Sequence, residues 1–142
     1  MKNISKSTTA SYHAGFLQFD VKLGEPAANL AALRGGLARL APAGPGIIVL
    51  PELWSCGFAY EQLQHFALQT VEMLEEMQRL AGKYAIYLAG SLPEEVLTEV
   101  DSAIYNTLYI VGPEGVVGSI RKQQLFAPMG EDRHFSPGCN PQ

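Results

Sequence analysis

The unbroken apolar run Ile-Ile-Val-Leu at 47–50 limits the possible folds more than any other feature of the chain. A strand with one face in water alternates apolar and polar residues, and this run does not alternate. Continuous apolar strands are typical of parallel sheets that are covered on both faces. The run therefore predicts a parallel strand buried on both sides, with Pro51 and Glu52 directly after its carboxyl end.

The residues before this run complete a strand–helix–strand unit. Residues 14–21 predict a strand, because alternate positions form a fully apolar face. Pro26 stands where the first turn of a helix accepts proline. Leucines then recur at steps of three and four, which predicts an amphipathic helix: Leu30, Leu33, Leu37 and Leu40. Residues 1–13 are polar and rich in Ser and Thr, so we interpret them as a flexible N-terminal arm and 14–142 as the domain.

A second unit of the same kind follows. Residues 60–83 predict a helical stretch that is broken near Gln69, and 84–92 is another nearly continuous apolar run. The apolar positions of the helix predict an inward face made of Val71, Leu74, Met77 and Leu80. Because short crossovers of this type join parallel strands, the sequence predicts a second βαβ unit.

The last part of the chain predicts a hairpin. Residues 93–102 are acidic and are expected to form an exposed loop. Strand-like segments at 103–111 and 116–122 are separated by the turn-forming tetrad Gly-Pro-Glu-Gly, so they should pair in antiparallel orientation. The predicted class is therefore α/β (α+β), with a mixed sheet made of two βαβ units and a hairpin.

Charge and composition exclude several classes of partner. The formal net charge is −4, and basic residues form no stripe, so nucleic acid is not an expected partner. The longest apolar runs have the length of strands and are too short to span a membrane. No export signal is evident at the N-terminus, which predicts a cytoplasmic protein.

The few cysteines and histidines predict no metal site. Cys56 and Cys139 lie far apart, and no His stands at ligand spacing from either of them. A cytoplasmic chain is expected to keep both thiols reduced. As a nucleophile Cys56 is disfavoured, because free Cys usually behaves as a small hydrophobic residue and no neighbour in sequence would lower its pKa.

Glu52 is the first candidate for chemistry. It follows a buried parallel strand directly, and open α/β sheets bind ligands at the carboxyl ends of such strands. An arbitrary glutamate at a strand end is usually exposed and has no further role. Here the apolar approach and the stiff Pro51 favour a functional position.

Lys122 and Glu131 are the candidates that could meet Glu52. By strand parity Lys122 shares the face of Ile120, so its ammonium is expected to point inward. Burying an isolated ammonium is unfavourable, and Glu52 and Glu131 are the natural anionic partners. Asn106 falls on the apolar parity of its own strand and needs hydrogen-bond partners there, which suits a brace for the site or for a loop.

The order of these motifs resembles the nitrilase, or carbon-nitrogen hydrolase, superfamily. The resemblance covers nearly everything after His13 and is carried by Leu-Pro-Glu at 50–52, Gly-Ser at 90–91, Tyr-Asn-Thr at 105–107, Arg-Lys at 121–122, Leu-Phe at 125–126 and Glu131. Members of the superfamily are α-β-β-α sandwiches built from two similar halves. By this resemblance the chain supplies the N-terminal half only. It departs from the family at Gln124, where a histidine is common.

The resemblance also implies roles for the residues. Glu52 would be the general base, Lys122 would stabilise the oxyanion, and Glu131 would position the substrate and hold the lysine. The implied reaction is the hydrolysis of a small amide or nitrile by a thiol, without metal or organic cofactor. The nucleophilic cysteine of the Cys-Glu-Lys triad is absent, so we expect the chain as given to be inactive.

Two alternatives stay open at the level of sequence. One is a noncatalytic α/β module for binding or assembly, and the other is an unrelated flavodoxin-like domain that binds a small ligand at its strand ends. The flavodoxin-like alternative does not require Glu52 and Lys122 to be close. If only half of the sandwich is present, uncovered apolar surface predicts a homo-oligomer.

Overall fold

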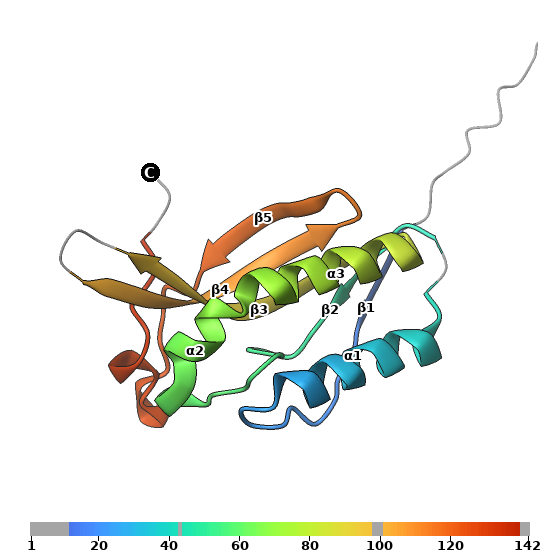
Figure 1. Ribbon diagram of the computed structural model, residues 1–142. Coiled ribbons are helices and arrows are strands. Elements are labelled where there is room, and N and C mark those ends of the chain that lie inside the picture. Colours follow the sequence, from blue (N-terminus) through green and yellow to red (C-terminus); the bar gives the residue numbers. More distant parts are fainter. Residues whose placement is uncertain (1–11, 43, 98–100, 140–142) are drawn as a thin grey trace, which may run out of the picture.

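A computed structural model describes residues 12–42, 44–97 and 101–139. It contains a mixed sheet of five strands that lie side by side in chain order (Figure 1). The first three strands are parallel, and the last two are antiparallel to their neighbours. The strands are β1 (His13–Phe16), β2 (Gly46–Val49), β3 (Tyr87–Leu97), β4 (Ser102–Gly112) and β5 (Gly115–Arg121).

The helices connect the parallel strands as the sequence predicts. One helix joins β1 to β2 and a broken helical segment joins β2 to β3, which confirms the two βαβ units. The break lies at Gln69, between two helices. The helical elements are α1 (Pro26–Leu40), η1 (Tyr60–Gln62), α2 (Leu63–Leu68), α3 (Thr70–Tyr84), η2 (Ala127–Met129) and η3 (Glu131–Arg133). No helix in the described part of the chain is both long enough and apolar enough to cross a membrane.

The main core lies between the helices and one face of the sheet (Figure 1). Side chains from α1, α3, β3 and β4 meet there, and several of them are inaccessible to water: Leu33, Leu37, Met77, Leu88 and Val111. Burial of a leucine or methionine side chain contributes roughly 1.5–3 kcal/mol. This face therefore holds the helices and the sheet together.

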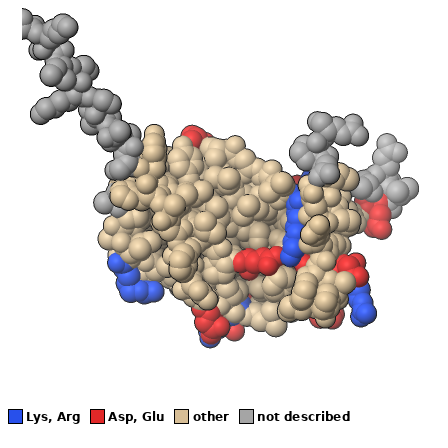
Figure 2. Space-filling view, turned by 180° about the vertical axis from the view of Figure 1, so that it is seen from behind, with Lys and Arg blue, Asp and Glu red and all other residues tan. Residues whose placement is uncertain are grey.

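No helix covers the opposite face in the described part of the chain. The strand register places Phe16 beside Val49, and Leu108 beside Ile120, all on the side away from the core. These side chains are 74%, 45%, 37% and 52% exposed, respectively. We call the surface formed by Phe16, Val49, Leu108 and Ile120 the open face. Figure 2 shows that it is largely uncharged, with acidic and basic side chains meeting at one side.

Two strand predictions need correction. The first strand was expected over 14–21, but β1 ends at Phe16 because its partner β2 ends at Val49, before Pro51. His13, assigned to the arm from the sequence, is the first residue of β1, and residues 1–11 of that arm lie outside the described residues. The loop expected over 93–102 is also wrong in part, because β3 continues to Leu97 and pairs with β4. Cross-strand pairing here prevails over the acidic composition.

Two burial predictions also need correction. Val71 was assigned to the inner face of its helix but is 67% exposed, and the buried positions of α3 are Thr70, Met73, Met77, Leu80 and Ala81. The apolar strand β2 was expected to be covered on both faces. Ile48 is buried against the core, whereas Val49 is exposed on the open face. The hairpin of β4 and β5 is confirmed.

Candidate active site

Glu52 stands in a tight turn after β2. The next residue, Leu53, has a positive φ of 46°, a conformation that costs a non-glycine residue energy. Its backbone N–H donates a hydrogen bond of 2.8 Å to the Ser91 hydroxyl, and its side chain is fully buried. These contacts anchor the turn, so that Glu52 is presented at the carboxyl end of the sheet.

Lys122 and Asn106 lie side by side at the same end of the sheet. The backbone N–H of Lys122 donates to the carbonyl oxygen of Asn106 at 2.8 Å, directly after the last paired residues of β5. Both side chains point to the side of the open face, as the parity with Leu108 and Ile120 requires. Lys122 thus shares the face of Ile120, as predicted, but this is the open face and not the packed side of the sheet, so the expected inward orientation needs correction: the Lys122 side chain is 30% exposed.

Glu131 reaches the site from the segment after β5. It begins η3, directly after Gly130, whose positive φ of 75° turns the chain. The Glu131 side chain is fully buried, and the backbone N–H of Phe126 donates to its Oε2 at 2.7 Å. The segment after β5 thus places a buried carboxylate at the site, and the backbone N–H of Phe126 in the same segment fixes its orientation.

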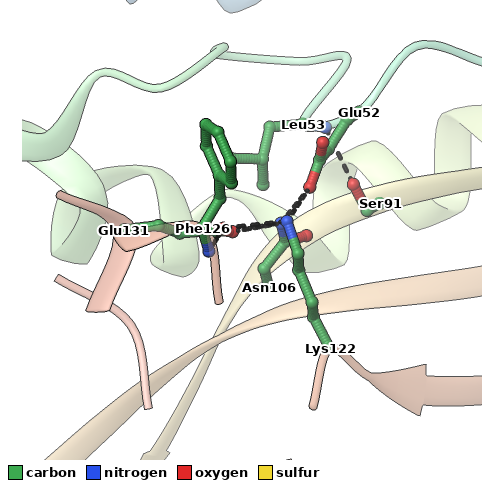
Figure 3. A network of polar contacts seen from close by, with 7 residues as sticks. All are labelled: Glu52, Leu53, Ser91, Asn106, Lys122, Phe126 and Glu131. Atoms are coloured by element: carbon green, nitrogen blue, oxygen red, sulfur yellow. Dashed lines mark hydrogen bonds and ion pairs between the residues drawn. The ribbon is translucent and has the colours of Figure 1, made fainter. Parts of the chain in front are cut away.

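The three candidate residues form one network with Asn106 (Figure 3). Lys122 Nζ donates to Glu52 Oε1 at 2.8 Å and to Glu131 Oε1 and Oε2 at 3.0 and 2.8 Å. Asn106 Nδ2 donates to Glu52 Oε1 at 2.8 Å and to Glu131 Oε1 at 3.2 Å. The ammonium of Lys122 and the neutral amide of Asn106 thus each donate to both carboxylates. A buried carboxylate such as that of Glu131 needs such donors.

The network shifts the pKa values of two of its members. Burial alone would raise the pKa of Glu131, but hydrogen bonds from Lys122, Phe126 and Asn106 bring it below the usual value. Burial alone would lower the pKa of Lys122, and its contacts with Glu131 and Glu52 raise it above the usual value. At neutral pH Glu131 is therefore an anion and Lys122 a cation.

The two carboxylates differ in how fully their oxygens are engaged by hydrogen bonds. Both oxygens of Glu131 already accept two hydrogen bonds each from Lys122, Asn106 and Phe126. For Glu52 only Oε1 is engaged, and Oε2 accepts no hydrogen bond from the described residues. The Glu52 side chain is 45% exposed, whereas that of Glu131 is 1% exposed. Glu52 is thus the carboxylate with an oxygen that is free to meet a further donor.

Two cavities meet at the network. One, of about 500 Å³, lies along the open face and is lined by Leu50, Ser91, Asn106, Leu108 and Ile120. The other, of about 440 Å³, is lined by aromatic and apolar side chains: Phe58, Tyr60, Leu125, Phe126 and Met129. Glu52 and Lys122 line both cavities. Both volumes are in the range of small-molecule sites.

Comparison with known proteins identifies the family. The family model for carbon-nitrogen hydrolases matches residues 13–140 of the chain. The chain belongs to the carbon-nitrogen hydrolase family. The flavodoxin-like alternative loses its support, because Glu52 and Lys122 are in contact at 2.8 Å.

Individual carbon-nitrogen hydrolases align with most of the chain. A 2-oxoglutaramate amidase of Bacillus subtilis is 30% identical over 86% of the chain and 46% of the relative. A nitrilase of Pyrococcus abyssi is 27% identical over 87% of the chain and 47% of the relative. The chain thus spans about half the length of these relatives.

Solved structures show the same fold. An amidase from a Nesterenkonia species superimposes with a TM-score of 0.71 at 26% identity, over 89% of the chain and 48% of that structure. A superfamily member from Xanthomonas campestris superimposes with a TM-score of 0.72 at 21% identity, over 87% of the chain and 45% of that structure. In a mutant of the Nesterenkonia amidase, acrylamide is added to the active-site cysteine.

Neither cysteine of the chain takes part in the network. The thiol of Cys56 is buried and donates to the carbonyl oxygen of Gly57, and burial raises its pKa to about 11. Cys139 is exposed and lies by a different hollow, which is lined by Glu94, Tyr105 and Arg121. The described residues also contain no group of three or more His, Cys, Asp or Glu side chains able to hold a metal ion.

The contribution of Ser91 to the site was not predicted. Its hydroxyl holds the turn at Leu53, and the adjacent Gly90 packs so closely that a Cβ would lie 2.8 Å from the Trp54 ring. A Gly-Ser pair inside an apolar strand is the signal that could have indicated close approach of another backbone. The role of Phe126 rests on its backbone N–H, which no side-chain pattern reveals.

Proposed function

We propose that the chain carries the base and the oxyanion-stabilising cation of a thiol-dependent hydrolase that acts on small amides. The observation that supports this most directly is the position of Lys122, which lies 2.8 Å from both Glu52 and Glu131 where two cavities meet. A fixed cation beside a carboxylate with one free oxygen suits acyl transfer, in which a proton moves and negative charge develops on a carbonyl oxygen.

The proposed reaction assigns one step to each residue. Glu52 Oε2 takes the proton of a thiol, and the thiolate attacks the amide carbon. Lys122 stabilises the oxyanion, while Glu131 keeps the lysine charged and positioned. Glu52 then returns the proton to the departing nitrogen, which leaves as ammonia or amine. Water, deprotonated by Glu52, then attacks the thioester; the C–S bond breaks, the acid is released as the carboxylate, and the proton held by Glu52 returns to the thiolate. None of these steps needs a metal or an organic cofactor.

We propose amides, rather than nitriles, as the substrate class. The Bacillus subtilis and Nesterenkonia relatives are named as amidases, and the Pyrococcus abyssi relative as a nitrilase. The apolar and aromatic cavity beside Glu52 suits a small organic substrate. A cytoplasmic location is part of the proposal, since both cysteines are free thiols.

The 142-residue chain by itself is proposed to be catalytically silent. Cys56 is buried with a raised pKa, and Cys139 lies by another hollow, so neither described thiol faces Glu52 Oε2. Without the nucleophile, the base and the oxyanion site retain only a small part of the rate enhancement. The complete site requires a thiol beside Glu52.

The experiment compares the 142-residue chain with the product of its gene read past the codon for Gln142. Ammonia release from propionamide should be at background for the chain. If the reading frame encodes a further cysteine between strand-like segments, its product should hydrolyse the amide. In that longer product, Glu52→Gln and Lys122→Met should each lower kcat/KM by roughly 10³-fold or more. Glu75→Gln, at an exposed position of α3, is the matched control and should keep full activity.

Two results would contradict the proposal. One is amide hydrolysis by the 142-residue chain that survives replacement of both Cys56 and Cys139 by Ser. The other is full activity of the Glu52→Gln variant. The alternative, a noncatalytic module for binding or assembly, is favoured by the apolar open face. It predicts a reading frame that ends without a further cysteine.

A further inference from the structure

Every hydrogen of the Lys122 ammonium is already engaged in the network. The group has three N–H donors, and the structure gives it three acceptors: Glu52 Oε1, Glu131 Oε1 and Glu131 Oε2. No donor is therefore left for a substrate. The oxyanion role of Lys122, which belongs to the proposed function, requires one of these three hydrogen bonds to be released.

Each of the three acceptor oxygens has a second donor. The backbone N–H of Phe126 donates to Glu131 Oε2 at 2.7 Å. Asn106 Nδ2 donates to the other two oxygens, at 2.8 Å for Glu52 Oε1 and 3.2 Å for Glu131 Oε1. When Lys122 turns away, the oxygen that it leaves keeps a donor. This matters because a buried carboxylate oxygen without a partner costs free energy.

We propose that Asn106 is a positioning residue that shares the two carboxylates with Lys122 and so allows the lysine to give one N–H to the oxyanion. This proposal rests on the proposed function. The hydrogen bond released is the one to Glu131 Oε1, which at 3.0 Å is the longest of the three. The ion pair is kept, because Lys122 still donates to Glu131 Oε2 at 2.8 Å.

The chemistry of the side chain suits this role. The amide nitrogen has two hydrogens, one for each carboxylate, and it carries no charge that would compete with Lys122. Asn106 is 2% exposed, and its backbone carbonyl accepts the N–H of Lys122, so the two side chains are held in fixed register. An aspartate would add a third carboxylate, and a leucine would leave Glu52 Oε1 and Glu131 Oε1 to Lys122 alone.

Two roles are possible for Asn106: it braces Lys122, or it shares the two carboxylates with Lys122. They predict opposite effects of its removal on how tightly the Lys122 ammonium is held. If Asn106 only braces the site, its removal loosens Lys122, and the ammonium hydrogens exchange faster with water. If Asn106 shares the carboxylates, its removal leaves Lys122 as their principal donor, and the ammonium is held more tightly. The rate of hydrogen exchange at Lys122 Nζ therefore separates the two roles by its sign.

The experiment uses the 142-residue chain labelled with ¹⁵N-lysine. The Lys122 ammonium signal is assigned by its loss in Lys122→Met, and its exchange with water is measured by NMR in wild type and in Asn106→Leu. We expect exchange to slow several-fold in the variant. Thr107→Val is the matched control, since Thr107 is the next residue of β4, is 2% exposed and also donates to a carboxylate, that of Glu94. It should leave the Lys122 exchange unchanged.

Asn106→Ala repeats the test with a smaller side chain, should leucine prevent folding. Faster exchange in the folded Asn106 variants, or the same change in Thr107→Val, would overturn the proposal. The NMR result does not depend on turnover, so a failure of the proposed amidase function would leave it readable. In a form of the protein that hydrolyses amides, Asn106→Leu should lower kcat about tenfold with KM unchanged, less than the loss of a direct oxyanion donor.

Discussion

The two faces of the sheet use the same strands for different purposes. On the helix side, Tyr109 and Val111 of β4 enter a closed core with α1 and α3. On the other side, Asn106 of the same strand enters the carboxylate network, and Leu108 is partly exposed. One face thus supplies packing, and the other supplies polar groups at its end and apolar surface along its length.

This difference shows where stability and chemistry lie in the chain. Burial of apolar area dominates the free energy of folding, and the helix-covered face contains most of it. The network on the open side concentrates charge, with one buried carboxylate and one carboxylate that has a free oxygen. Substitutions on the two faces should therefore separate loss of folding from loss of the site.

The largest effect is expected on the helix-covered face. Leu88→Ala removes a fully buried side chain from the core and should lower the free energy of unfolding by about 2–5 kcal/mol. Ile120→Ala, on the open face, should change it by less than about 0.5 kcal/mol, because the side chain is 52% exposed. Urea denaturation followed by circular dichroism measures both. Equal losses would show that the two faces do not differ in this way.

A smaller effect is expected when the two carboxylates of the network are compared. Glu131→Gln removes a buried acceptor of four hydrogen bonds and should cost about 1–3 kcal/mol of unfolding free energy. Glu52→Gln should cost less than about 1 kcal/mol, since its side chain is 45% exposed and solvent screens the pair. The same denaturation curves test this. A larger loss for Glu52→Gln would reverse the proposed division between structural and catalytic carboxylate.

The pH dependence of stability should single out Glu131. Its pKa in the folded state is below the usual 4.5, so its ionised form stabilises the fold above that pH and the contribution disappears as the pH falls through the folded pKa. Between pH 7 and pH 3 the wild type should therefore lose more stability than Glu131→Gln. Unfolding free energies at a series of pH values give the difference. Parallel curves for the two proteins would contradict the assignment.

The local pattern of the chain was sufficient for most of the fold. Apolar periodicity predicted the helices and their break at Gln69. It could do so because each helix packs one face against the core, and that face repeats about every 3.6 residues. It failed where tertiary pairing decides the outcome. Glu94 lies in β3, which pairs with β4 there, and its carboxylate accepts hydrogen bonds from Thr107 of β4 and Arg121 of β5, partners that are 13 and 27 residues away. Val49 is exposed because no described element covers its face, which a single strand cannot reveal.

The site could be predicted in part for similar reasons. Strand ends and parity brought Glu52 and Lys122 to the same edge, and the structure places them in contact. Glu131 was a weak signal in sequence, because only the turn at Gly130 carries its side chain into the site. The sequence also placed Asn106 on an inward parity, but the sharing of both carboxylates depends on distances between three separate segments.

The smallest effect on stability, and a separate effect on association, is expected from the open face. Because this face is apolar and largely uncharged, two copies can cover one another without repulsion of like charges, and we expect the 142-residue chain to self-associate (Figure 2). Ile120→Lys should weaken association while changing the unfolding free energy of the monomer by less than about 0.5 kcal/mol. Sedimentation velocity over a range of concentrations measures the change.

Val71→Lys, at a 67% exposed position on α3, is the matched control and should associate like wild type. A wild-type chain that stays monomeric at all concentrations, or an equal effect of both lysines, would show that the open face is not the surface that joins the copies.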